Sequence, residues 1–120
     1  MTARQWFFDT AVRGLASQSF ERSVGDGGRC SYRGKNGRKC AVGYLIPDRE
    51  YHREMEYHNA HETLRDHPRL RRYRKWLTRL QGAHDAADSP GDMVQRLYAF
   101  ASHERLDPEV LNSLGMVFNP

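Results

Sequence analysis

The stretch that decides the predicted fold runs from residue 30 to residue 48 and reads CSYRGKNGRKCAVGYLIPD. Asn36-Gly37 stands between two runs that contain β-forming residues, and an Asn-Gly pair in this setting is a strong signal for a hairpin. The segments on both sides have mostly helical patterns. The sequence therefore predicts one domain, residues 1–120, with an α+β fold that is mostly α: one β-hairpin at about residues 29–45, packed against three to four helices.

Loop length decides which side chains share a face of this hairpin. A two-residue loop would place Cys30 and Cys40 on opposite faces. A three-residue loop, 35–37, with its glycine in the left-handed conformation, sets Gly34 opposite Arg38 and places both cysteines on the apolar face. Burial strongly penalises a slip of one residue in register. We therefore expect the three-residue loop, with both cysteines reduced and buried.

The helical segments are predicted from apolar spacing and from start signals such as Pro at the first position. The segment between residues 49 and 67 has weak periodicity, and we expect it to be the least ordered part, with one or two helical turns. The expected helices are residues 4–20, a long helix opened by His67-Pro68, a helix started by Ser89-Pro90, and residues 109–114, ended by Gly115. The inward stripe of the long helix is Leu70, Tyr73, Leu77, Leu80 and His84.

Composition limits the function classes. The 120 residues are 38% hydrophobic and carry a formal net charge of +4, which favours partners with negative charge, such as a nucleic acid, a nucleotide or an acidic protein face. No run of 18 apolar residues predicts a membrane helix, and residues 1–20 lack the apolar core of a signal peptide. We therefore expect action in the cytoplasm, where cysteines are usually free thiols. No cofactor is predicted.

Two sequence patterns of this chain are similar to those of a known protein family. The pattern Cys-x-Tyr-Arg-Gly-x-x-Gly-x-x-Cys-Ala-x-Gly-x-Leu-Ile-Pro-Asp, followed by Leu-Gln-x-x-His-Asp at residues 80–85, resembles a family of small proteins of tailed phages and bacterial prophages. The resemblance covers about residues 8–106. Tyr44 stands where the family pattern leads us to expect a small residue or a cysteine, which implies different local packing. The resemblance implies a phage or prophage source, and therefore action in the cytoplasm of a bacterial host cell, but no particular activity.

The strongest charge feature is the run from Arg69 to Arg79, which holds five arginines and one lysine within 11 residues, with a tryptophan among them. Arginines on a helix contact phosphates, and an aromatic ring stacks on an unpaired base. The alternatives are a solvated face whose arginines pair with nearby carboxylates, and a contact with an acidic protein. The candidate binding residues of this run are Arg71, Arg72, Arg74, Lys75, Trp76 and Arg79.

The histidines raise the question of a metal site. His58 and His61 would share one face of a helix, and imidazole and thiolate are the usual ligands of zinc. Cys30 and Cys40 have no Cys-x-x-Cys spacing, so a mixed site would require the segment around residues 52–67 to fold onto the hairpin. These four residues are the candidate ligands, and we predict no specific metal.

His84-Asp85 is the best candidate for catalysis, because a histidine held by a carboxylate can act as a general base. The alternative is a structural role, in which His84 fills the inner stripe and bonds a hairpin carbonyl while Asp85 or Gln81 braces Arg33. Arg33 is expected on the hairpin face away from the core. It is the residue there that we predict to touch an anionic ligand.

These observations predict a non-catalytic phage or prophage accessory protein. Its expected role is an anti-defence inhibitor, similar to anti-CRISPR proteins, that binds a host defence protein, another macromolecule or an anionic ligand; this rests on analogy with the implied source. Two alternatives remain open. One is a basic regulator that binds DNA or RNA through the helix at residues 69–79, and the other is a small hydrolase that uses His84 and Asp85.

Overall fold

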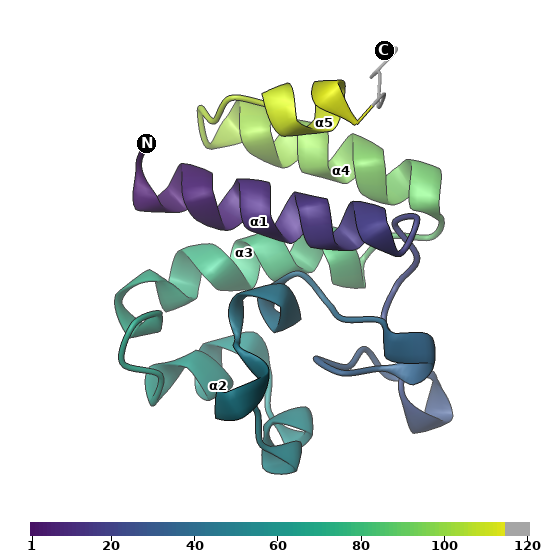
Figure 1. Cartoon of the computed structure of the whole chain (residues 1–120), viewed down its shortest axis with the longest axis vertical. Helices are drawn as coiled ribbons and strands as arrows, with labels where there is room; N and C mark the ends of the chain where they lie inside the picture. The colour runs from purple at the N-terminus through teal and green to yellow at the C-terminus, as the bar shows by residue number, and fades with distance from the viewer. Residues whose placement is uncertain (115–120) are drawn as a thin grey trace.

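The computed structural model of the protein describes residues 1–114, and within them it contains five α-helices (Figure 1). The α-helices are α1 (Ala3–Ser17), α2 (Ala60–Arg65), α3 (Arg74–Asp85), α4 (Pro90–His103) and α5 (Glu109–Ser113). Six short 3₁₀ turns fill the connections: η1 (Asp26–Gly28), η2 (Lys35–Gly37), η3 (Val42–Leu45), η4 (Asp48–Glu50), η5 (Arg53–Tyr57) and η6 (Arg71–Tyr73). No helix of this part of the chain has the length and apolar composition needed to cross a bilayer.

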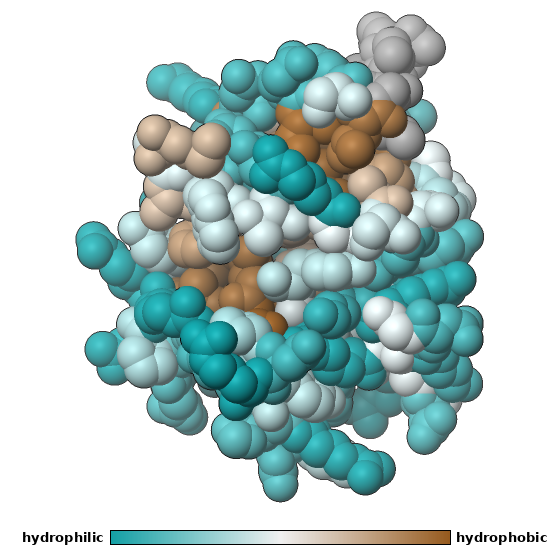
Figure 2. Space-filling view, viewed as in Figure 1, coloured by the Kyte–Doolittle hydropathy of each residue, from teal (hydrophilic) through white to brown (hydrophobic). Residues whose placement is uncertain are grey.

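Helices α1, α3, α4 and α5 form layers above an irregular segment, residues 18–59, which connects α1 to α2. Helix α5 packs on α1 and helix α4 packs on α3, while α2 and most of the 3₁₀ turns lie at the opposite end of the molecule (Figure 1). Aromatic rings join the layers: Phe8 of α1 stacks on Phe100 of α4 at 6.2 Å, and Trp76 of α3 meets Phe100 edge-on at 5.3 Å. Hydrophilic side chains cover most of the irregular end in Figure 2. The core therefore lies mainly between the helices and the turns packed beneath them.

Local signals mark two helix starts. Ser89 caps α4, since its hydroxyl accepts a hydrogen bond from the Asp92 amide at 3.0 Å, and Pro90 is the first helical residue, as predicted. Helix α2 starts with a capping box that the sequence-based prediction missed: Asn59 accepts from the Glu62 amide at 2.9 Å, and the Glu62 carboxylate accepts from the Asn59 amide at 3.2 Å. An Asn-x-x-Glu pattern is the sequence signal for this motif.

The predicted β-hairpin at residues 29–45 is wrong, and with it the α+β class. Across residues 1–114 the backbone forms no strand, only a single isolated bridge between Val24 and Cys30. The turn itself was predicted correctly: the Gly34 amide donates to the Arg38 carbonyl at 2.8 Å, and Gly37 has a φ of 71°. Pairing stops there, and residues 42–45 coil into η3 instead of continuing a second strand.

Side chains from distant segments take the place of the missing ladder. The amides of Tyr32 and Arg33 donate to the carboxylate of Glu56 at 2.9 and 3.0 Å. Gln18 donates to the Lys39 carbonyl at 2.8 Å and accepts from its amide at 3.0 Å. Since these partners satisfy the backbone groups that strands would pair, the segment needs no sheet to be stable. In the same way, the Val42 amide of η3 donates to the side chain of Gln81 of α3 at 2.9 Å.

The inner stripe of the long helix is confirmed, but its start is not. Leu70, Leu77, Leu80 and His84 are buried, whereas the regular α-helix begins only at Arg74, after a turn and η6. The last helix ends at Ser113, and the stop predicted at Gly115 lies outside the described residues.

The two cysteines differ in exposure. Cys40 is 1% exposed, as predicted, but Cys30 is exposed, so its predicted burial is wrong. Both are free thiols in the structure. The physical reason is the missing sheet, because only strand pairing would have turned both side chains to the same face.

Candidate functional site

The three polar residues of the Leu-Gln-x-x-His-Asp pattern form one network on the C-terminal half of α3. His84 Nε2 accepts a hydrogen bond from the Ser23 amide at 2.9 Å, and its Nδ1 lies 2.8 Å from Asp85 Oδ1. Gln81 donates to the same Asp85 oxygen at 2.7 Å and accepts from the Val42 amide. The network thus ties α3 to the irregular segment at two points, while Arg33 bonds to other groups.

This geometry fixes the tautomer of His84. Nε2 accepts from an N–H group and therefore carries no hydrogen, so Nδ1 carries the proton and donates it to Asp85. Both ring nitrogens are used, and the ring is 0% exposed. A general base needs an accessible lone pair, and His84 offers none. The ring bonds a backbone amide, where the structural alternative expected a carbonyl.

One group of possible metal ligands lies close together in residues 1–114: Cys30, His84 and Asp85, whose ligand atoms are within 4.8 Å of one another. A metal at Nδ1 of His84 would displace the proton to Nε2, which would then face the N–H of Ser23. His84 therefore does not suit a metal. Although the residue as a whole is exposed, its thiol is partly buried beside Asp85, and both effects raise the pKa of the Cys30 thiol. The raised pKa disfavours the thiolate that a metal or a nucleophilic reaction requires.

The four predicted metal ligands are only partly brought together. Cys30, Cys40 and His58 line one small pocket of about 100 Å³, and His61 is not among its lining residues. Burial raises the pKa of the Cys40 thiol to about 12, and its sulfur accepts a hydrogen bond from the Gly43 amide at 3.3 Å. Cys40 is thus a neutral core thiol at ordinary pH.

Arg33 holds the irregular segment together. Its guanidinium donates to the carbonyls of Gly43 and Ile46, each at 2.7 Å, and pairs with Asp48 at 3.0 Å. It also lies 4.9 Å above the ring of Tyr51. Lys39 and then Arg33 hold the pKa of the Asp48 carboxyl below its ordinary value. These contacts occupy most of the donors with which Arg33 would bind an anionic ligand.

Glu56 is the residue that the sequence-based prediction missed. Besides the two backbone amides, it accepts a hydrogen bond from the Tyr51 hydroxyl at 2.6 Å. Burial, reinforced by Glu56, raises the pKa of Tyr51 to about 12. No local signal marks Glu56, because its partners Tyr32 and Arg33 lie more than twenty positions earlier.

The run from residue 69 to residue 79 presents cations of two kinds. Three of them are held by other groups: Arg69 by Glu50 at 2.5 Å, Arg79 by Glu104 at 3.1 Å, and Arg74 by the carbonyl of Arg71 at 3.2 Å. The other three are exposed, and no carboxylate of residues 1–114 lies within ion-pair distance of them. We call these three the basic face: Arg71, Arg72 and Lys75.

The basic face lies at the junction of two elements, since Arg71 and Arg72 belong to η6 and Lys75 to the first turn of α3. Lys75 follows Arg71 by four positions and Arg72 by three. Trp76 is not part of this surface: it is 2% exposed and packs against Phe7 and Phe100. The other aromatic residue of this run, Tyr73, is half-buried, and the guanidinium of Arg72 lies 5.4 Å from the centre of its ring. The run therefore offers no fully exposed ring on which a base could stack.

Comparison with known proteins adds no relative. No family model matches the chain, and no curated protein or solved structure is significantly similar to it.

Proposed function

We propose that this protein is a non-catalytic binding protein that recognises an anionic macromolecule through the basic face. The observation that carries the proposal is that Arg71, Arg72 and Lys75 have no carboxylate partner within the described chain, beside three cations that other groups hold. Clustered cations without carboxylate partners favour an external anion, because an opposite charge lowers their mutual repulsion. The network around His84 supports a non-catalytic role.

The biological setting that we propose is that of a phage or prophage accessory protein acting in the cytoplasm of the bacterial host. In this setting the partner is a component of host defence, and binding inhibits it. This part rests on the resemblance of the residue 30–48 and 80–85 patterns to phage proteins. The basic face is compatible with the acidic surface of a protein and with the phosphates of a nucleic acid.

Nucleic-acid binding is the second candidate, favoured by the two arginines of the basic face, since guanidinium groups bind phosphates in a bidentate manner. Without an exposed Trp76, such binding would rest on phosphate contacts and would depend little on sequence.

The test compares the wild-type protein with the triple variant Arg71→Gln, Arg72→Gln, Lys75→Gln. Arg13, Arg49 and Arg65 are also exposed and lie on three different elements, so changing these three to Gln gives a control of equal charge. Immobilised proteins capture partners from host lysate, with and without nuclease, and gel shifts use duplex DNA and RNA at low and physiological salt. We expect the basic-face variant to lose at least about tenfold in affinity, while the control loses less than about threefold.

The salt dependence separates the candidates. For a nucleic acid, the slope of log K against log salt should become shallower by about 0.9 per lost phosphate contact. For an acidic protein, nuclease should leave capture intact, and the variant should mainly lower the association rate. Equal losses in both triple variants would show that the basic face is only a solubilising surface.

A further inference from the structure

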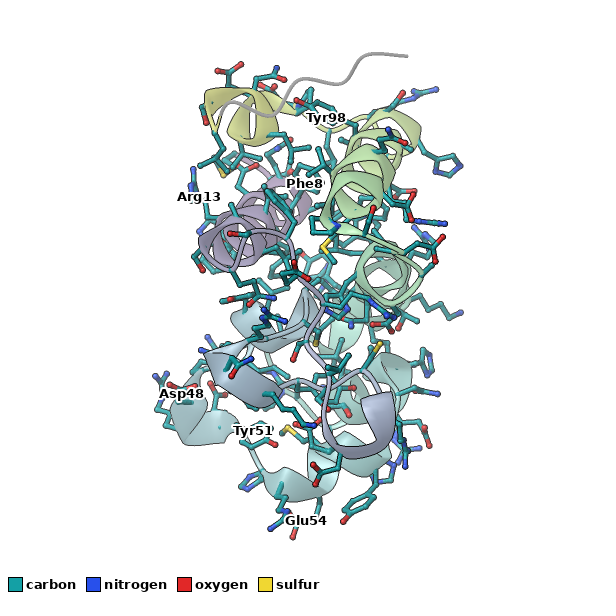
Figure 3. All side chains as sticks on the ribbon, turned by 90° about the vertical axis from the view of Figure 1, so that its right-hand side faces the viewer. Phe8, Arg13, Asp48, Tyr51, Glu54 and Tyr98 are labelled. Atoms are coloured by element: carbon teal, nitrogen blue, oxygen red, sulfur yellow. The ribbon has the colours of Figure 1, made fainter. Side chains whose placement is uncertain are left out.

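A pocket of about 530 Å³ opens at the irregular end of the molecule, remote in sequence from the basic face. We call it the loop pocket. Its walls come from the glycine-rich loop at residues 25–26, from residues between 29 and 35 and from residues between 51 and 57. Tyr51, labelled in Figure 3, belongs to the last of these walls, in the lower half of the molecule. The pocket volume lies in the range of about 300–1,000 Å³ that is typical of small-molecule sites.

The lining of the loop pocket is cationic. Four basic and two acidic side chains line it, a net charge of +2. Three of the basic residues, Arg29, Lys35 and Arg53, are exposed and have no carboxylate within ion-pair distance in residues 1–114. The acidic Glu56 already has partners, because two amides and a hydroxyl donate to it. The pocket therefore offers three free cations against one other carboxylate, that of Asp26.

An aromatic ring stands at the same pocket. Tyr57 is 71% exposed, more than Trp6 at 53%. An aromatic ring left in water has no packing role in the core, whereas its face provides a platform on which a nucleobase stacks. Cations for a phosphate and a ring for a base thus line one pocket.

We propose that the loop pocket binds a nucleoside phosphate, with the phosphate held by Arg29, Lys35 and Arg53 and the base stacked on Tyr57. This inference goes beyond the proposed function, since the loop pocket shares no residue with the basic face. A free nucleotide and the 5′-phosphorylated end of a strand supply the same chemistry. Neither requires Arg33 to leave its contacts with backbone carbonyls.

Cys30 provides a built-in reporter of occupancy. It lines the loop pocket and is exposed, while Cys40 is buried. A thiol reagent should therefore modify Cys30 first in the folded protein. A ligand in the loop pocket should slow this reaction by covering the thiol.

The binding test uses calorimetric titration with AMP, inorganic phosphate, adenosine and a 5′-phosphorylated dinucleotide. We expect AMP to bind the wild-type protein at least about tenfold more tightly than phosphate, because stacking adds to the charge contacts. Tyr57→Ala should reduce that ratio to within about threefold. The triple variant Arg29→Gln, Lys35→Gln, Arg53→Gln should weaken both AMP and phosphate by at least about tenfold. The control is again Arg13→Gln, Arg49→Gln, Arg65→Gln, which should change neither.

The reporter experiment measures the rate of Cys30 modification at fixed pH. Saturating AMP should slow it at least about fivefold, and adenosine at the same concentration should not, because the phosphate contributes most of the affinity. If the pocket triple variant fails to fold, the single variant Arg53→Glu replaces it. Three results would overturn the proposal: AMP and phosphate binding equally to the wild type, equal losses in the pocket and control variants, or no protection of Cys30 by AMP. Tighter binding of the dinucleotide than of AMP would identify a strand end as the source of the phosphate.

Discussion

The ring of Tyr44 lies directly against Gly14 of α1. A Cβ built on Gly14 would be 2.3 Å from Cγ of that ring and 2.4 and 2.6 Å from its two Cδ atoms. The Tyr44 hydroxyl donates a short hydrogen bond to Gln18, directly after α1. The bulky residue in the Cys30–Asp48 stretch is therefore accommodated by a glycine in the facing helix, which lets η3 approach α1 closely.

Gly14→Ala should destabilise the protein, although alanine is the better helix former by about 1 kcal/mol. The added methyl group would force the Tyr44 ring or the backbone to move, which costs about 1–3 kcal/mol in a packed site. Urea unfolding measures the change.

Gly82→Ala is the matched control, since Gly82 also lies inside an α-helix and an added Cβ there meets nothing within 4 Å. It should stabilise the protein by about 0.5–1 kcal/mol. In a Tyr44→Ala background the penalty at Gly14 should disappear. A stabilising Gly14→Ala in the wild-type background would contradict the close packing.

Gly37→Val should destabilise the turn at residues 35–37. Gly37 has a φ of 71°, a conformation that costs a side chain with a Cβ about 1–2 kcal/mol, and more when it is β-branched. Lys35→Ala at the exposed start of the same turn should change the free energy of unfolding by less than about 0.5 kcal/mol. Equal urea midpoints for the two variants would show that the left-handed conformation is not required.

Thiol titration of the native protein should find one reactive cysteine. Cys30 is exposed, and its raised pKa predicts that its reaction accelerates as the pH increases above about 8 toward that pKa, since the thiolate is the reactive form. Cys40, buried and with a pKa of about 12, should react only after unfolding. Cys30→Ser is the control and should leave no fast phase. Two fast thiols in the native wild type would contradict the burial of Cys40.

His67 should make stability depend on pH. It is 5% exposed, and burial lowers its pKa below the ordinary 6.5, against the opposing effect of Glu50, whose Oε1 lies 3.2 Å from Nε2. The unfolded state therefore binds more protons than the folded state as the pH falls through 6.5. The stability that the buried neutral ring of His67 contributes is fully present above its ordinary pKa of 6.5. It is lost as the pH falls from there toward and below the lowered pKa of the folded state.

The measurement compares urea unfolding of the wild-type protein and His67→Gln from neutral to mildly acidic pH. The wild type should lose more stability than the variant on acidification, because the other histidines are common to both. Glu50→Gln should enlarge the loss in the wild-type background, since it removes the carboxylate that favours the protonated ring. Parallel pH profiles for wild type and His67→Gln would contradict the effect of burial.

The sequence by itself determined those features whose partners are close in the chain. The stripe from Leu70 to His84 is set by spacing, the start of α4 by Ser89-Pro90, and the tight turn by Asn36-Gly37, because each depends on bonds or contacts within a few residues. The capping box of α2 also depends only on residues close in the chain, and its Asn-x-x-Glu pattern was sufficient to predict it.

The tertiary structure alone decided the conformation of the chain on either side of that turn. Whether Tyr32, Arg33 and Val42 pair as strands or bind side chains depends on Glu56 and Gln81, which lie 23 to 39 positions away in sequence.

The same dependence on distant partners holds for the candidate sites. The role of His84 was fixed by the Ser23 amide 61 positions earlier, and the free state of the basic face depends on where Glu50 and Glu104 lie. A backbone amide requires an acceptor but not a particular one. Local pattern therefore leaves the choice between a sheet and a side-chain-capped loop open until the chain has folded.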